Sequence, residues 1–368
     1  MAKIHICELS DAIPQLPDVG VFDPKSTSLC SYGELFLCAL GFEQRCLTLP
    51  RQLAEAGWRF GESRYIQYST NKDDNDVNRP ELESCLGRMS ENAHPLQGDE
   101  PEFTTRLREL VERLEPPREG ALPRVTFDIS VAANRMIMKC MKVLLHSNIS
   151  LRIVYSEAAI YHPTRDEYDR DRARWKTEAQ VGPEQGVSDV SLSNDYPGHQ
   201  LDPLPDCIIL FPSFKAERSR AVIGKVDMSL LVAPGKKVYW LVGAPHLEND
   251  SWRMEAMREI NGLRAEHLQF EVKTFDYKDT LQTLEKIHAI VWSTSNISLS
   301  PMGSKLQAVG TSLFCFLHPE VRVWLATPKK YNASQYSEGC KATWAVNFGP
   351  TSALRKLLER VGSLEVAG

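Results

Sequence analysis

The chain of 368 residues is 42% hydrophobic and 25% charged, a composition typical of a globular protein with room for two domains. Its formal net charge of -5 does not indicate a nucleic-acid-binding protein, because such proteins usually carry a surplus or stripe of Lys and Arg, and a local basic groove stays open as the alternative. No apolar run reaches the ~18 residues that span a bilayer, and residues 1–8 lack the layout of a signal peptide, so we expect a cytoplasmic protein that does not enter the membrane.

The first half alternates short β-rich runs with longer amphipathic stretches, which predicts a parallel α/β fold. The expected strands are 1–7, 35–40, 64–68, 124–128 and 151–155, and the expected helices lie near 43–56, 79–91, 102–114 and 133–146.

A stretch that is rich first in charge and then in Gly, Ser, Asp and Pro follows, and we expect residues 163–203 to be a linker. The second half then repeats the alternation of strands and helices. Its expected strands are 207–212, 237–242, 270–275, 288–292 and 321–325, and its expected helices lie near 215–225, 250–263, 277–287, 303–316 and 351–361.

The two halves share a pattern that predicts an internal duplication. In each half an apolar strand leads into a turn with a Phe and an Arg, at residues 41–45 (GFEQR) and 213–218 (SFKAER). We therefore predict an α/β fold of two pseudo-repeated Rossmann-like three-layer units with mainly parallel sheets. The expected domains are 1–162, the linker 163–203, and 204–368 with its C-terminal helix. Such a duplication places a cleft between two similar halves, where a ligand can bind.

Ligands of parallel α/β folds collect beyond the carboxyl ends of the strands, so the residues that follow each strand are the candidate site residues. Asp128 ends an apolar strand, and Ser130 follows it. An Asp at this place can bind a ribose hydroxyl, hold a metal ion or cap the next helix. Residues 292–294 stand at the corresponding place of the second half, so the carboxylate is not duplicated and any chemistry is expected to be asymmetric.

The turns after the first strand of each half carry candidate cations. Arg45, Lys215 and Arg218 would supply positive charge to a ligand, and Gly41 suits a tight turn whose backbone amides face that ligand. The alternative is structural, with Glu43 matching the helix dipole and Arg45 paired nearby. If the arginines bind a ligand, replacing Arg45 and Arg218 by Ala should abolish binding with little change in melting temperature.

A helix start in the second half has the composition of a phosphate site. Residues 298–305 (SLSPMGSK) bring hydroxyls, a Gly and a Lys to the beginning of a predicted helix. Free backbone amides together with Ser304 and Lys305 would hold a phosphate group. Ordinary helix capping by the same residues is the alternative.

The spacing of residues along the sequence does not indicate a metal site. None of the nine His forms HExxH or a pair with ligand spacing, and the nine Cys show no CxxC. The acidic tract of Asp73, Asp74 and Asp76 lacks the downstream Glu of a calcium loop. We therefore expect no metal site, and free buried thiols rather than disulfides.

The order of these motifs resembles a group of uncharacterised prokaryotic proteins with tandem Rossmann-like domains. The matching residues are 41–45, the Asp-Ile-Ser of 128–130, residues 155–161 and the Phe-x-x-Glu-Arg of 214–218. The resemblance spans both halves and implies a bacterial protein from an anti-phage defence neighbourhood, without an established activity. The duplicated layout is also similar to the CARF and SAVED architecture of nucleotide sensors, an analogy of fold that does not fix function. This chain departs from the pattern in having Ser213 in place of Gly.

The leading hypothesis is a non-catalytic binding or regulatory subunit. It would hold a nucleotide-like ligand between its halves, or dock a partner protein in a defence complex, and the sequence indicates no other cofactor. Asp128 would orient a sugar hydroxyl or an amine of the ligand. The ligand-binding residues would be Arg45, Asp128, Ser130, Lys215, Arg218, Ser304 and Lys305.

Two other functions fit the same residues. One is a metal-dependent enzyme acting on a nucleotide or nucleic-acid phosphate, with Glu43, Asp128 and Glu157 as metal or acid–base groups. The other is a pure scaffold that binds protein partners or forms a homo-oligomer.

Overall fold

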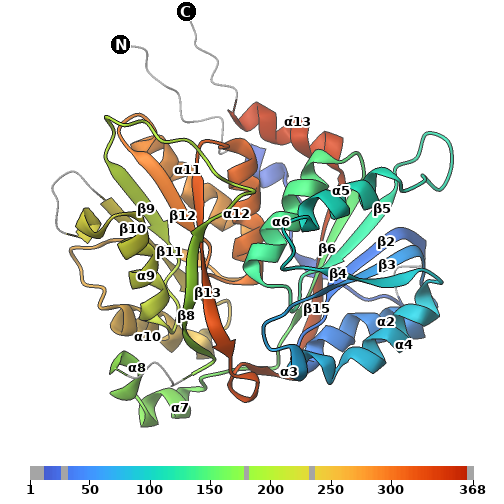
Figure 1. The fold of residues 1–368 in the computed structure, drawn as a ribbon, viewed down its shortest axis with the longest axis horizontal. Coiled ribbons are helices and arrows are strands. Elements are labelled where there is room, and N and C mark those ends of the chain that lie inside the picture. The colour runs from blue at the N-terminus through green and yellow to red at the C-terminus, as the bar shows by residue number, and fades with distance from the viewer. Residues whose placement is uncertain (1–11, 26–31, 178–181, 232–236, 363–368) are drawn as a thin grey trace, which may run out of the picture. The chain divides into compact units, whose positions relative to one another are not determined.

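The computed structural model describes residues 12–25, 32–177, 182–231 and 237–362, which fold into two compact α/β units (Figure 1). The first unit comprises residues 15–162 and 333–358, and the second consists chiefly of residues 163–332. The strand expected at residues 1–7 lies outside the described residues. None of the described helices is long and apolar enough to cross a membrane.

The first unit contains a seven-stranded sheet in the order β1-β15-β6-β5-β2-β3-β4. The strands from β6 to β4 run parallel, whereas β15 is antiparallel to both of its neighbours. The strands are β1 (Gly20–Val21), β2 (Tyr32–Ala39), β3 (Arg59–Gln67), β4 (Ala93–Gln97), β5 (Arg124–Asp128), β6 (Ser150–Glu157) and β15 (Ala342–Pro350).

Helices cover both faces of this sheet, which makes three layers (Figure 1). Helices α2 (Thr48–Glu55) and α4 (Arg79–Met89) pack together on one face, and α5 (Phe103–Glu112) and α6 (Asn134–His146) on the other. This follows from right-handed crossovers, because β3 and β4 lie on one side of β2 while β5 and β6 lie on the other. Leu35, Phe36 and Leu37 of β2 are fully buried as a result.

Shorter elements complete the first unit. Strands β7 (Ile160–Tyr161) and β14 (Ser337–Glu338) form a small antiparallel sheet of their own. The others are η2 (Gln44–Leu47), α3 (Lys72–Asp76) and η5 (Ala333–Gln335), whereas η1 (Ile13–Gln15) and α13 (Thr351–Gly362) each contain residues of both units.

The second unit contains a six-stranded sheet in the order β11-β10-β9-β12-β13-β8, in which only β8 is antiparallel to its neighbour. Its strands are β8 (Glu184–Leu192), β9 (Asp206–Leu210), β10 (Lys237–Ala244), β11 (Leu268–Lys273), β12 (Asn296–Ser300) and β13 (Arg322–Tyr331). Its helices are α7 (Arg165–Arg170), α8 (Arg174–Thr177), α9 (Ala216–Val226), η3 (Met228–Leu231), η4 (Glu248–Asp250), α10 (Trp252–Asn261), α11 (Tyr277–Val291) and α12 (Lys305–Leu317).

The two sheets have the same topology, which confirms the predicted fold of two Rossmann-like units. Strands β9, β10, β11, β12 and β13 take the places of β2, β3, β4, β5 and β6, and each sheet continues with an antiparallel strand. The register pairs Leu37 with Phe127 in the first sheet and Ile209 with Leu299 in the second. Asp128 therefore corresponds to Ser300.

The strand expected at 288–292 is wrong, because these residues lie at the end of α11 and just beyond it. Leu281, Leu284, Ile287 and Val291 recur at helical spacing and are fully buried, so the helix continues to Val291. The true strand is β12, whose five residues are all buried although three of them are polar. Its polar residues alternate with apolar ones, a pattern that does not indicate a central strand covered by helices on both faces, because such strands are usually continuous apolar runs.

The expected domain boundaries also differ from the structure. The predicted linker 163–203 contains α7, α8 and β8, and β8 pairs with β13 along the edge of the second sheet. The last strand, β15, pairs with β6 in the first sheet instead of ending the second domain. The segment that follows each half, β8 after the first and β15 after the second, thus pairs with the sheet of the other unit. The local pattern of the sequence does not indicate this long-range pairing.

The described cysteines are free thiols, as expected, and all but Cys340 are buried.

Candidate functional site

The topology of the first sheet singles out the loops after β2 and β5. These strands are neighbours, but the chain leaves β2 for a helix on one face and β5 for a helix on the other. Open α/β sheets bind ligands outside the carboxyl ends of the strands at such a switch point. The sequence places Glu43 and Arg45 after β2, and Asp128 and Ser130 at the end of β5.

Arg45 is held in a buried ion pair after β2. Its side chain is only 2% exposed, and its Nε and Nη2 lie 2.9 and 2.8 Å from Oε2 of Glu43. Its Nη1 donates to the backbone oxygen of Ser156 in β6 at 3.1 Å. The guanidinium therefore connects the turn after β2 to β6. These contacts agree with the alternative in which Glu43 and Arg45 have a structural role.

A shell of polar and aromatic side chains surrounds the ion pair. The guanidinium lies 5.7 and 5.8 Å from the ring centres of Tyr155 and Tyr161, whose hydroxyls are 2.5 Å apart. Ser337 of β14 donates to the carboxylate of Glu43. Because Ser337 is nearly 300 positions further along the chain, the sequence analysis missed this part of the shell.

Glu157 at the end of β6 is also buried, and its carboxylate accepts a hydrogen bond from Nε1 of Trp344 at 3.1 Å. Trp344 lies in β15, the strand that returns from the second half of the chain. The swapped strand thus supplies the partner of this carboxylate.

Asp128 belongs to a second buried network at the same edge. Its Oδ1 accepts hydrogen bonds from the backbone amide of Ser130, at 2.9 Å, and from the hydroxyl of Ser130. That hydroxyl accepts from the amide of Ser156 at 2.7 Å. Burial raises the pKa of Asp128 to about 6, although the bonds to Ser130 and the charge of Arg45 act in the opposite direction.

Asp128 does not cap the following helix. Of the three roles that the sequence suggested for it, helix capping is therefore excluded, and binding of a ribose hydroxyl or of a metal ion is left. The N-cap of α6 is Ala133, whose side chain makes no capping hydrogen bond. The amide of Ala133 instead donates to the hydroxyl of Tyr68 at 3.1 Å. Nearby, Asp99 accepts from the amide and hydroxyl of Ser69 at 2.6 and 2.8 Å and pairs with Arg135 of α6.

The equivalent helix of the second unit begins differently. Helix α12 has a complete capping box, in which Ser304 accepts from the amide of Gln307 and the Gln307 side chain accepts from the amide of Ser304. The Ser304 hydroxyl also donates to the backbone oxygen of Thr274 at 2.5 Å. Ser304 thus acts as a cap, and the half-buried Lys305 is the first residue of the helix.

Arg218 repeats the role of Arg45 in the second unit. Its Nη1 lies 2.8 and 2.9 Å from the two carboxylate oxygens of Glu184, and its Nη2 donates to the backbone oxygen of Ala326 at 3.0 Å. The strand registers make Ala326 the counterpart of Ser156, the residue that accepts from Arg45. Both arginines therefore fasten the turn after the first strand to the same position of the sheet.

Lys215 lies in the same turn of the second unit and is 5% exposed. Its ammonium is 6.0 Å from the ring centre of Trp175, and burial lowers its pKa. The structure thus places Glu43, Arg45, Asp128, Ser130 and Glu157 in the first unit, and Lys215, Arg218, Ser304 and Lys305 in the second.

The three carboxylates proposed for an enzyme do not form a compact metal-binding set. Within the part of the chain that the structure describes, a different group of three residues has its ligand atoms within 4.8 Å of one another. That group is Glu285, His288 and His318 of the second unit.

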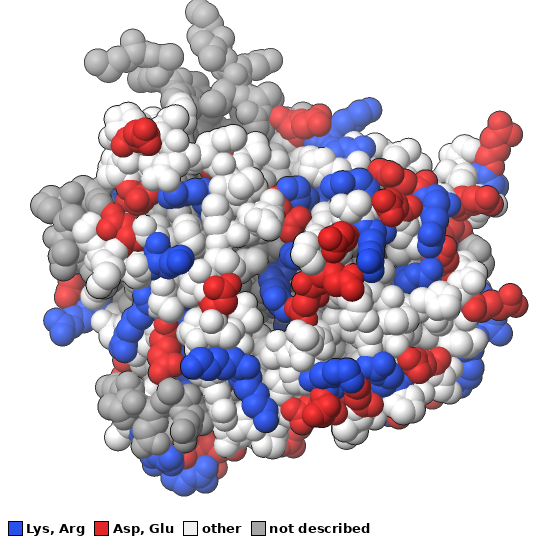
Figure 2. Space-filling model, in the orientation of Figure 1, with Lys and Arg blue, Asp and Glu red and all other residues white. Residues whose placement is uncertain are grey.

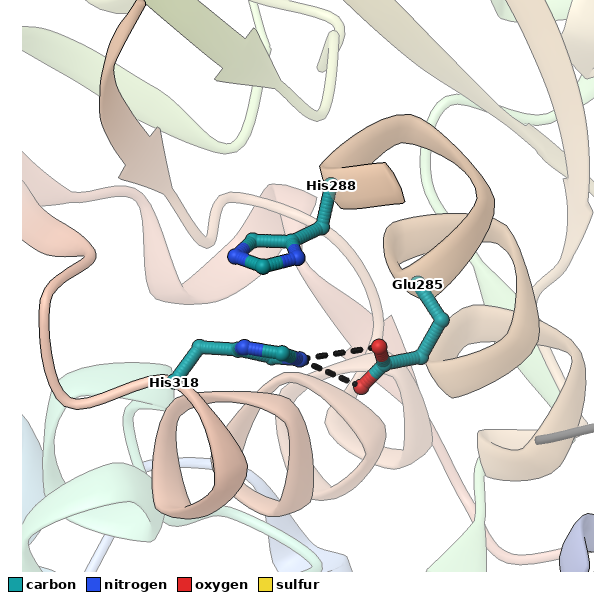
Figure 3. A group of neighbouring side chains, drawn as sticks. All are labelled: Glu285, His288 and His318. Atoms are coloured by element: carbon teal, nitrogen blue, oxygen red, sulfur yellow. Dashed lines mark hydrogen bonds and ion pairs between the residues drawn. The ribbon is translucent and has the colours of Figure 1, made fainter. Parts of the chain in front are cut away.

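This second-unit cluster, which the sequence analysis missed, is shown in Figure 3. Glu285 and His288 lie one turn apart on α11, and His318 follows the end of α12. Nε2 of His318 is 2.9 and 2.8 Å from the oxygens of Glu285, and the two imidazole rings have their centres 3.7 Å apart and their planes tilted by 33° (Figure 3). The signal in the sequence was Glu-x-x-His at 285–288, a spacing that puts both side chains on one helix face.

Glu320 contacts the cluster from the loop before β13. Its Oε1 lies 2.8 Å from Nε2 of His288 and 3.3 Å from Nδ1 of His318. Burial alone would lower the pKa of His318, but the hydrogen bonds to Glu285 and Glu320 raise it to about 9.

The fold and site define a tandem Rossmann-like α/β protein. No family model and no curated protein matches the sequence. Among solved structures, the chain is similar to a Type III CRISPR defence DNA nuclease activated by cyclic oligoadenylate, with 11% identity and a TM-score of 0.44 over 76% of this chain and 63% of the nuclease. It is also similar to the cytoplasmic domain of a prokaryotic cation chloride cotransporter, with 8% identity and a TM-score of 0.25 over 81% of this chain and 96% of that domain.

The chain therefore spans less than two thirds of the nuclease. Both TM-scores are below 0.5, so neither likeness carries a conclusion about function.

Proposed function

We propose that this protein is a non-catalytic binding or regulatory subunit that holds a nucleotide-like ligand at the switch point of its first sheet. The observation that carries the proposal is Asp128, a buried carboxylate with a pKa of about 6 at the end of β5, the strand that leads to the N-terminus of α6. Acidic residues at the edge of Rossmann-like sheets accept hydrogen bonds from ribose hydroxyls, and helix N-termini attract anionic groups.

The difference between the units supports this assignment. An ionised carboxylate that is 2% exposed is energetically unfavourable, and carboxylates perturbed by burial concentrate at functional sites. The second unit has the same sheet topology but carries Ser300 at this position and a fully capped helix after it. A carboxylate needed only for the fold would be expected in both units, so its presence in one favours a ligand.

The cations of this proposal differ from those of the sequence hypothesis. Arg45 and Arg218 are engaged in ion pairs within their own units. We therefore assign an anionic part of the ligand to the positive end of the α6 helix dipole, with help from Arg135, which also forms an ion pair, with Asp99, but is 27% exposed. Asp128 and Ser130 would then contact a hydroxyl of the same ligand.

The distribution of charge on one face of the protein agrees with a small ligand rather than a polyanion. On the face shown in Figure 2, acidic and basic side chains of the described residues are interspersed, without an extended basic area. A nucleic-acid groove would concentrate Lys and Arg on one surface.

The test begins with the protein purified from its own host. Mass spectrometry of the small molecules released on denaturation identifies a co-purified ligand. Isothermal titration calorimetry then measures binding of that ligand, or of a panel of adenine mononucleotides, dinucleotides, and linear and cyclic oligoadenylates. We expect Asp128→Asn to weaken binding at least tenfold, because a hydrogen bond to a charged group contributes about 1.5–3 kcal/mol.

Ser300→Ala is the matched control, because it changes the corresponding position of the second sheet. It should leave the dissociation constant unchanged. The proposal is refuted if Asp128→Asn binds as tightly as the wild type, or if the protein releases no small molecule and binds none of the panel.

A further inference from the structure

The cluster of Glu285, His288 and His318 has the donor atoms of a transition-metal site. Two imidazole nitrogens and one carboxylate oxygen come within 4.8 Å of one another. This is the ligand set of many sites that hold a divalent metal through three protein side chains and keep a fourth position for water. Imidazole donors favour zinc and other late first-row metals over magnesium or calcium, which prefer oxygen ligands only.

The secondary structure brings these donors together on rigid elements. Glu285 and His288 point from one face of α11, a helix of 15 residues whose inner face is buried. His318 terminates α12, which packs against α11. The exposed fractions are 4% for Glu285, 13% for His288 and 15% for His318, so the site is sheltered but accessible to an ion.

Glu320 completes the arrangement by orienting both histidines. It contacts Nε2 of His288 and Nδ1 of His318 through the same carboxylate oxygen. A histidine that binds a metal through one ring nitrogen commonly donates its other N–H to a carboxylate, which fixes the ring and its tautomer. His318 already shows this arrangement, with Nε2 facing Glu285 and Nδ1 facing Glu320.

The helix ends also favour a cation here. His288 lies in the last turn of α11, and His318 is the C-cap of α12. The carbonyl ends of helices carry a partial negative charge that attracts cations. In a parallel sheet, a helix that follows a strand begins near the carboxyl ends of the strands and ends near their amino ends. The cluster therefore lies at the opposite edge of the second sheet from the loops that follow its strands.

We propose that Glu285, His288 and His318 bind one divalent transition-metal ion, with Zn²⁺ as the best match, and that Glu320 positions the two histidines. The metal links the ends of α11 and α12 in the second unit. It is a stabilising site in this proposal and takes no part in ligand binding by the first unit.

The experiment uses the full-length chain without a histidine tag, because a tag would itself bind metal. After removal of metals with a chelator and dialysis, elemental analysis measures zinc uptake, and Co²⁺ replaces zinc as a spectroscopic probe. We expect one zinc per chain, visible absorption of four-coordinate Co²⁺, and a rise in melting temperature with zinc concentration.

Variants distinguish this site from general binding by surface histidines. His288→Gln and His318→Gln should each abolish stoichiometric uptake and the Co²⁺ absorption, and Glu320→Gln should weaken zinc binding roughly 10–100-fold. His146→Gln, which removes an exposed histidine of the first unit, should bind like the wild type. Circular dichroism checks that each variant is folded.

The wild-type titration needs no variant, so failure of a variant to fold does not weaken the test. Zinc uptake far below one per chain in the wild type overturns the proposal. Unchanged uptake in folded His288→Gln and His318→Gln overturns it as well.

Discussion

Replacement of Asp128 by Asn should make this protein more stable at neutral pH, because it removes a charge that burial disfavours. Asn keeps the shape of the side chain and an oxygen that can accept from the amide of Ser130, as Oδ1 of Asp128 does at 2.9 Å. What changes is the ionised group, which is 2% exposed. A gain in stability from loss of a site residue is typical of groups retained for function.

The size of the gain follows from the pKa. The pKa of Asp128 rises from an ordinary 3.8 to about 6, and at 1.36 kcal/mol per pKa unit this corresponds to about 3 kcal/mol. A carboxyl whose pKa is higher in the folded state holds its proton more tightly there, so the wild type loses this stability as the pH rises from about 4 to about 6. The advantage of Asn should therefore be about 3 kcal/mol above pH 7 and about half of that at pH 5.

Urea denaturation followed by circular dichroism at pH 5 and pH 8 measures both values. Asp99→Asn is the matched control, because the pKa of Asp99 is lowered: burial acts to raise it, but hydrogen bonds from Ser69 and the charge of Arg135 outweigh that effect. Asp99→Asn should destabilise the protein at pH 8, opposite in sign to Asp128→Asn. If Asp128→Asn is less stable than the wild type at pH 8, the carboxylate is part of the structure and the reasoning fails.

Three further predictions concern packing and ion pairs, each measured as the free energy of unfolding in urea. Arg45→Ala should lose about 3–5 kcal/mol, because it leaves a buried carboxylate without its partner. A free energy of unfolding close to that of the wild type would instead favour the ligand-binding hypothesis for Arg45. Arg218→Ala should lose less, about 1–3 kcal/mol, because its ion pair is partly exposed; a loss equal to that of Arg45→Ala would contradict the role given to burial. Gly310→Ala should lower the free energy of unfolding by about 1–3 kcal/mol, because a Cβ there would collide with the backbone oxygen of Tyr277. Gly224→Ala is the control: a Cβ at this position of α9 meets open space, so the substitution should raise the free energy of unfolding by about 0.5–1 kcal/mol.

The sequence predicted the elements whose periodicity is local. The strand around Leu35, Phe36 and Leu37 is apolar on both faces, as expected for a strand that helices cover on both sides. The duplication was also visible, because the turn after this strand recurs in the second half. The prediction failed at β12, where Ser298 and Ser300 are fully buried polar residues and give no apolar run.

The pairing of distant segments could not be predicted from local patterns. Residues 184–192 resemble a polar loop because they form an antiparallel edge strand, half-buried and half-exposed. The partner of Glu43, Ser337, arrives with the segment that returns from the second half. The cluster around His318 likewise joins residues from two helices and a loop, of which only Glu285 and His288 are close in sequence.

The duplication itself helps to separate structural from functional residues. Features present in both units, such as the arginine that donates to Ser156 in one and to Ala326 in the other, are required by the shared topology. Features present in one unit are not required by that topology, and Asp128 is such a feature because Ser300 replaces it in an equivalent sheet. The arginines were expected to bind a ligand because they follow the ends of strands, and their recurrence within a duplicated fold is also what a structural role produces. The residue that does not recur is therefore the better candidate for function.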